Sequence, residues 1–138
     1  MNHKSKGSNA ERELVNMFWK AGWASLRVAG SGSAPHALPD IVAGNGMRRL
    51  AIECKATSQA YQGIKKKQAE DLQKFAHLFG AEAWVGIRFD NEQWYFLMLE
   101  DLLSKKNAFS ADLNKAKLKG LLFEELIGVF RQKKLGED

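Results

Sequence analysis

The 138-residue sequence is poor in cysteine and proline and has no long apolar run. Its single cysteine, Cys54, cannot close an intramolecular disulfide or supply a cysteine zinc site, which fits a reducing compartment. The apolar runs are only a few residues long, far below the roughly 20 residues needed to cross a bilayer, and the amino end has no apolar segment typical of a secretory signal. We therefore expect a cytoplasmic protein that does not enter the membrane.

The composition, 45% hydrophobic and 27% charged, is that of a folded globular protein and argues against a disordered or low-complexity chain. The length suits one domain with one core. We expect residues 1–138 to form a single domain.

Charge is distributed unevenly along the chain. Residues 1–67 contain eleven basic and four acidic residues, whereas residues 68–138 contain ten basic and twelve acidic ones. The two halves therefore have net charges of +7 and −2. A basic half in a protein of pI about 9.4 indicates a polyanionic partner, most often nucleic acid, although a solvated basic face is an equal alternative on charge alone.

Hydrophobic spacing predicts a helix over residues 8–21, ended by Gly22, and then a strand over residues 23–28. A Gly-, Ser- and Pro-rich loop follows over residues 29–39. Residues 40–43 and 50–55 resemble two strands joined by the turn at residues 44–46, which predicts a hairpin.

The second half of the chain begins with a basic linker, after which apolar spacing predicts a helix that ends at Gly80. Residues 83–89 and 93–99 predict a second hairpin, and residues 100–138 predict one or two further helices. The order of elements fits an α/β or α+β domain, with a mixed central sheet flanked by helices and a C-terminal helical extension; we expect the α/β class.

Acidic residues converge on the first hairpin. In its second strand, Glu53 and Lys55 share one face, and pairing Gly44 with Arg49 places Asp40 across from Glu53. Two carboxylates this close are costly unless a cation bridges them, and hard oxygen ligands suit Mg²⁺ or Mn²⁺. The hairpin is therefore a candidate metal site.

Two further polar residues lie on apolar helix faces. Glu11 precedes Leu14 and Val15 by one turn, so it points inward and adds a third carboxylate; equally, it could form a capping box with Ser8. Gln68 precedes Leu72 in the same way, with an ordinary boundary glutamine as the alternative.

The combination and order of these motifs resemble the PD-(D/E)XK nuclease superfamily, and within it the archaeal Holliday junction resolvases of the Hjc type. The resemblance covers about residues 3–99 and rests on four segments: residues 6–15, 27–31, 39–43 and 50–55. It implies a restriction-endonuclease-like fold, a homodimer, and Mg²⁺-dependent cleavage, with Mn²⁺ as a substitute, of two opposed strands at a four-way DNA junction in recombination and repair.

The resemblance also assigns roles to residues. The catalytic residues that it implies are Glu11, Ser31, Asp40, Glu53 and Lys55, with Ser33 as an alternative to Ser31. The metal ligands that it implies are Glu11, Asp40, Glu53 and the backbone carbonyl of Cys54, whose thiol faces the core.

Basic residues near these motifs are candidate DNA contacts. Arg12 and Arg27 match basic positions of the family. Lys65, Lys66 and Lys67 begin the second helix, where cations oppose the helix dipole, which favours phosphate contact over a merely solvated end. The full DNA-binding set that we expect is Lys4, Lys6, Arg12, Arg27, Lys65, Lys66 and Lys67.

Two alternatives remain beside a nucleoid-associated junction resolvase: another PD-(D/E)XK endonuclease or nickase, or a non-catalytic DNA-architecture protein. For the dimer, residues 94–99 have two apolar faces, only one of which a monomer core needs. We therefore expect the dimer interface on the second hairpin. The four tryptophans, at positions 19, 23, 84 and 94, are expected in the core or in that interface.

Overall fold

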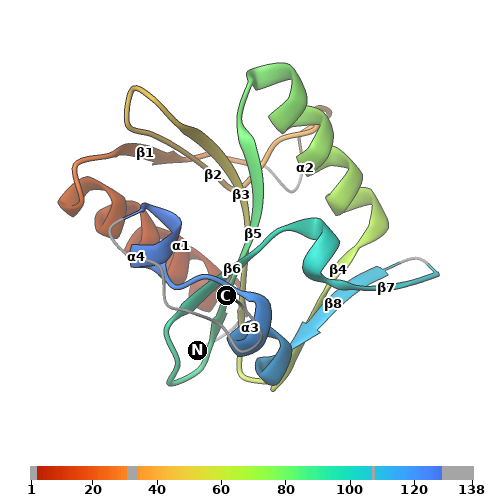
Figure 1. Cartoon of the computed structure of the whole chain (residues 1–138). Coiled ribbons are helices and arrows are strands. Elements are labelled where there is room, and N and C mark those ends of the chain that lie inside the picture. The colour runs from red at the N-terminus through yellow and green to blue at the C-terminus, as the bar shows by residue number, and fades with distance from the viewer. Residues whose placement is uncertain (1–2, 31–33, 107, 129–138) are drawn as a thin grey trace, which may run out of the picture.

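The computed structural model describes residues 3–30, 34–106 and 108–128 (Figure 1). Its elements, in chain order, are α1 His3–Lys20, β1 Ala24–Arg27, β2 Ile41–Gly44, β3 Arg49–Thr57, β4 Tyr61–Lys65, α2 Lys66–Phe79, β5 Glu82–Phe89, β6 Trp94–Leu97, the 3₁₀ helix η1 Leu99–Asp101, β7 Leu103–Lys105, β8 Ala108–Asp112, α3 Leu113–Lys119 and α4 Phe123–Leu126. Within these ranges no helix is long and apolar enough to cross a membrane.

Five strands form the central sheet in the order β1-β2-β3-β5-β6. The β3–β5 pair is parallel and the other pairs are antiparallel, so the sheet is mixed, as predicted. Helices α1 and α4 cover one face and α2 covers the other (Figure 1). The expected α/β class, a mixed central sheet flanked by helices, is confirmed.

The β2–β3 hairpin has the predicted register. Gly44 pairs with Arg49, and Ile41 pairs with Ile52 at the other end. Asp40 lies just beyond β2, where its backbone N–H donates to the carbonyl of Ile52 at 3.0 Å. Since Glu53 follows Ile52 directly within β3, this register brings Asp40 beside Glu53.

A second, three-stranded sheet was not predicted. It has the order β4-β8-β7, with β4 and β7 both antiparallel to β8. The segment expected as a basic linker thus contains strand β4 and the first residues of α2. The expectation of a purely helical extension over residues 100–138 is also wrong, because β7 and β8 precede the two short helices α3 and α4. The pairing of β4 with β8 joins segments more than forty residues apart, which local periodicity cannot show.

The predicted dimer interface on the second hairpin is also wrong. Trp94, Tyr95, Phe96 and Leu97 are all buried within one chain. Leu121 forms a backbone bridge with Phe96, with two hydrogen bonds of 2.8 Å, and the ring of Phe123 packs near that of Phe96. The C-terminal segment therefore covers the apolar face that seemed available for a partner.

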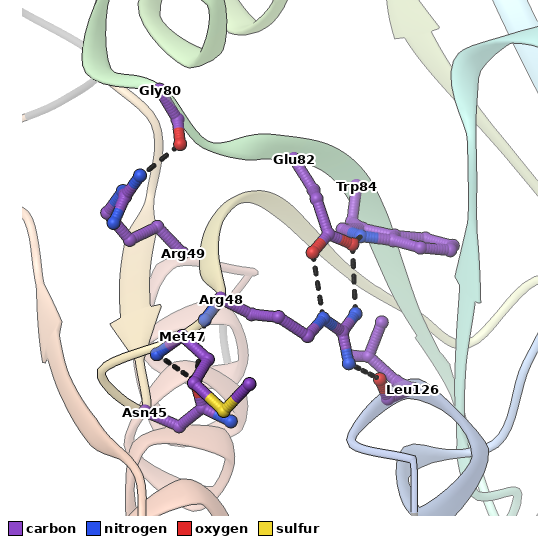
Figure 2. A network of polar contacts seen from close by, with 8 residues as sticks. All are labelled: Asn45, Met47, Arg48, Arg49, Gly80, Glu82, Trp84 and Leu126. Carbon is purple, nitrogen blue, oxygen red and sulfur yellow. Dashed lines mark hydrogen bonds and ion pairs between the residues drawn. The ribbon is translucent and has the colours of Figure 1, made fainter.

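An arginine at the β2–β3 turn fastens α4 to the sheet (Figure 2). The Arg48 guanidinium donates two hydrogen bonds to the Glu82 carboxylate, at 2.8 and 2.9 Å, and a third to the Leu126 carbonyl at 2.7 Å. It also lies 5.5 Å from the centre of the Trp23 ring. One side chain thus joins the first hairpin, β5 and the C-terminal helix.

Candidate active site

The sheet and α2 enclose a cleft of about 1000 Å³. It is lined by residues from five segments: Glu11 on α1, residues 34–38, Asp40, residues 53–55 on β3, and one face of α2. Four of the expected catalytic side chains, those of Glu11, Asp40, Glu53 and Lys55, therefore line the cleft.

Asp40 and Glu53 form the acidic centre of the cleft. The Asp40 Oδ2 atom accepts a hydrogen bond of 2.8 Å from the backbone N–H of Cys54, which fixes its carboxylate next to Glu53. Glu53 is buried, with 8% of its surface exposed. Burial first, and then the charge of Asp40, raises the pKa of Glu53 to about 8. Because Glu53 is buried and lies near two other acids, Asp40 and Glu11, a cation would bind favourably beside it.

Lys55 stands on the same face of β3 as Glu53. Its Nζ atom lies 3.7 Å from Glu53 Oε2, and its side chain is about one quarter exposed. The ammonium is the group that lowers the pKa of Glu53, opposing the other causes. The alternation of side chains on a strand brings both groups into the cleft, as predicted.

Glu11 is held by an arginine. Arg27 on β1 donates through Nε to Glu11 Oε1 at 3.1 Å and through Nη2 to Ser8 Oγ at 3.3 Å. Burial, and to a lesser extent Asp40, raises the pKa of Glu11 against the effect of Arg27. The alternative capping box with Ser8 is wrong, because α1 begins five residues earlier, at His3.

The thiol and the backbone of Cys54 face different parts of the structure. Its thiol belongs to the core cluster on the α1 side of the sheet, where burial raises its pKa well above the usual value. The residue also lines the cleft. The thiol is thus turned into the core, as predicted, while the backbone of Cys54 borders the acidic centre.

The acidic centre offers oxygen donors for a divalent cation. Among the described residues, no three His, Cys, Asp or Glu side chains are spaced to hold a metal ion. Glu11 is engaged by Arg27 instead. Asp40 and Glu53 remain as a pair of hard oxygen donors, and Mg²⁺ binds proteins through one or two carboxylates while keeping several waters. The pair of Asp40 and Glu53 fits such an ion, and Glu11 lines the same cleft.

The expected DNA-binding residues are divided among three places. Arg12 and Arg27 both act electrostatically on Glu11, and Lys67 lines the cleft. Lys65 ends β4 as the N-cap of α2, and Lys66 begins that helix, but neither is among the cleft-lining residues described. Lys6 forms an ion pair with Asp90 in a separate hollow beside α1. Ser31 and Ser33, and the side chain of Lys4, lie outside the described part of the chain.

Other cleft residues were missed by the sequence interpretation. Asp71, Lys74 and Leu78 follow Lys67 by four, seven and eleven residues, so they form one stripe of α2 that faces the cleft. His36 also lines it. The helical spacing was visible in the sequence, but which face of α2 turns to the site was not. Gln68 lines the cleft and accepts from the N–H of Lys65 at 3.1 Å, so it is also a helix cap.

The chain was compared with known proteins. A family model described as archaeal Holliday junction resolvase (hjc) matches residues 2–135. A crossover junction endodeoxyribonuclease Hjc of Archaeoglobus fulgidus is 42% identical over 134 residues, which cover 97% of this chain and 98% of that protein. The Hjc of Methanocaldococcus jannaschii is 32% identical over 139 residues, covering 99% and 98% of the two chains.

A solved structure agrees with the sequence matches. The crystal structure of the Archaeoglobus fulgidus Hjc, a Holliday junction resolvase from an archaeal hyperthermophile, superimposes with a TM-score of 0.82 at 39% identity. The match covers 88% of this chain and all of that one. With nearly the whole length matched in both sequence and fold, the chain belongs to the archaeal Holliday junction resolvase family.

Proposed function

We propose that this chain is a Mg²⁺-dependent endodeoxyribonuclease that resolves four-way DNA junctions by hydrolysing phosphodiester bonds in two opposed strands. The observation that carries the proposal is the placement of Asp40, Glu53 and Lys55 in one cleft. A purely architectural DNA-binding protein has no use for a buried acid pair beside a lysine. The names of the relatives support the same activity.

Asp40 and Glu53 would hold the cation, with the backbone carbonyl of Cys54 and the carboxylate of Glu11 as the remaining proposed contacts. Mn²⁺, which also prefers oxygen ligands, should substitute for Mg²⁺. When bound, such an ion polarises a phosphate oxygen and lowers the pKa of a coordinated water.

The side chains of the cleft contribute the rest. The N–H of Cys54 orients Asp40, and the position of Lys55 lets its ammonium stabilise the negative charge that develops on the reacting phosphate. Ser31 is proposed as the serine of the catalytic loop on the resemblance alone. Arg12, Arg27, Lys4, Lys6 and the lysines at the start of α2 are proposed to contact DNA phosphates, which positions a substrate without reading its sequence.

Two cuts in a two-fold symmetric junction require two sites, so we propose that the protein acts as a homodimer. The exposed apolar side chains that suit a second copy lie on α2. Phe75 and Phe79 stack at 5.0 Å between ring centres, and Leu78 and Phe79 are 76% and 52% exposed. Aromatic and aliphatic side chains grouped in this way are typical of an interface.

The dimer has a matched test. Leu78→Glu should raise the dimer dissociation constant at least about tenfold, since a charge in an apolar contact is costly. Met47→Glu is the control, because Met47 is 88% exposed but lies on the β2–β3 turn. Sedimentation velocity over a dilution series measures both. If the two variants dimerise equally, α2 is not part of the dimer interface.

The activity is tested by comparing a four-way junction with a linear duplex of the same sequences, in Mg²⁺ and in EDTA. We expect paired cuts in the junction in Mg²⁺ only. Cutting of both substrates would indicate another endonuclease of the superfamily, and single cuts would indicate a nickase. Binding without any cleavage would indicate an architectural protein. A junction substrate would also place the protein at the nucleoid.

A further inference from the structure

One acidic side chain stands among the basic residues on the cleft face of α2. Lys67 and Lys74, two turns apart, both line the cleft, and Asp71 lies between them on the same stripe. The Lys67 Nζ atom contacts both carboxylate oxygens of Asp71, at 2.9 and 3.2 Å. A carboxylate in this position repels a DNA backbone and pairs with a lysine that faces the cleft.

The energetics of the helix do not explain the pair. Lys67 lies in the first turn of α2, where a cation opposes the helix dipole. The order of the pair, lysine before acid, is also the less favourable one for an i,i+4 contact. A contact with little value for the helix, facing the proposed DNA path, points to a role in binding.

We propose that Asp71 competes with DNA phosphates for Lys67, and so sets how tightly the cleft holds the DNA backbone. Without DNA, the Asp71 carboxylate is paired with the Lys67 ammonium. A phosphate that enters the cleft must either displace Asp71 from Lys67 or remain without that lysine. Asp71 is thus a determinant of affinity, and Lys74 is a further phosphate contact on the same stripe. This inference rests on the proposed function.

The helix contains its own control. Lys66 and Glu70 form the neighbouring i,i+4 pair in the same orientation, with 4.0 Å between Lys66 Nζ and Glu70 Oε1. Both side chains are exposed, and neither is among the described residues that line the cleft. Asp71→Asn and Glu70→Gln each remove one negative charge from α2. They differ in whether that charge faces the cleft.

Binding to a four-way junction in EDTA, over a series of KCl concentrations, tests the proposal. Asp71→Asn should tighten binding about two- to fivefold, the range expected for one exposed charge contact. It should also steepen the salt dependence by about one released counterion per cleft. Glu70→Gln should change the slope by much less, and Asp71→Glu should bind as the wild type does.

The effect must also depend on Lys67. In a double-mutant cycle, Asp71→Asn in a Lys67→Gln background should lose most of its gain in affinity. The proposal is overturned if Asp71→Asn and Glu70→Gln behave alike, or if the gain persists without Lys67. If the wild type neither binds nor cuts junctions, the proposed function fails instead. Circular dichroism of the total helix content and the Asp71→Glu variant separate both results from misfolding.

Discussion

Two glutamates on neighbouring strands of one sheet have opposite electrostatic environments. Glu53 on β3 is buried beside Asp40, and its pKa is raised to about 8. Glu82 on β5 accepts two hydrogen bonds from Arg48 and one of 3.1 Å from Trp84 Nε1, and its pKa is lowered, chiefly by Arg48 (Figure 2). Arg48 gives Glu82 two charge-assisted hydrogen bonds, so Glu82 has a structural role. At Glu53, burial and the charge of Asp40 outweigh the nearby lysine, so this carboxyl is suited to a cation from solution.

The largest expected effect is on junction cleavage, which should depend on Glu53 and not on Glu82. Glu53→Gln, Asp40→Asn and Lys55→Ala should each lower junction cleavage at least about a hundredfold, because each removes a group proposed to act at the reacting phosphate. Binding to the junction in Ca²⁺ should largely persist. Glu82→Gln should retain cleavage. Wild-type cleavage by Lys55→Ala would contradict the assignment of this cleft as the catalytic site.

The stability of the metal-free protein should show the same contrast. Between the usual pKa of 4.5 and about 8, native Glu53 keeps its proton while the unfolded chain has lost it. The unfolding free energy therefore falls as pH rises through this range. Removing the charge with Glu53→Gln should add roughly 1–3 kcal/mol near pH 8 and little near pH 4.5. Urea unfolding in EDTA at several pH values measures this; equal effects at both pH values would contradict it.

Metal binding should be linked to a proton. Because the ligand form of Glu53 is the deprotonated one, Mg²⁺ affinity should increase as pH rises toward about 8, with up to one proton released per site. Titration calorimetry in buffers of different ionisation enthalpy counts those protons. The wild type and Glu82→Gln should agree, whereas Glu53→Gln should release fewer protons and bind Mg²⁺ more weakly. A pH-independent affinity would argue that Glu53 is not a ligand.

The smallest expected effect concerns the structural acid. Glu82→Gln should lower the unfolding free energy by about 0.5–1 kcal/mol, because the Arg48–Glu82 pair is partly exposed and screened by water. The lowered pKa of Glu82 adds stability above its usual pKa, and that stability is lost as pH falls below it. The pH trend is thus opposite to that of Glu53. If wild type and Glu82→Gln have the same unfolding curve, the Arg48–Glu82 pair contributes nothing measurable to stability.

The sequence predicted the first hairpin in detail. The turn at residues 44–46 set the register, and a strand fixes the direction of every second side chain, so the places of Asp40, Glu53 and Lys55 followed from local geometry. The inward position of Glu11 also followed from helical spacing, although its partner Arg27, sixteen residues away, did not. These are short-range properties of the chain.

The remaining features depended on contacts that are distant in sequence. The small sheet depends on the pairing of β4 with β8. The burial of the second hairpin depends on the backbone bridge between Leu121 and Phe96. The same packing decided which face of α2 turns toward the cleft, and so placed Lys67, Asp71 and Lys74 there. The sequence by itself determined which residues are suited to the chemistry, because side-chain direction within an element is a local property. The tertiary structure decided which surfaces stay exposed and which charges meet, because both depend on elements packed from far along the chain.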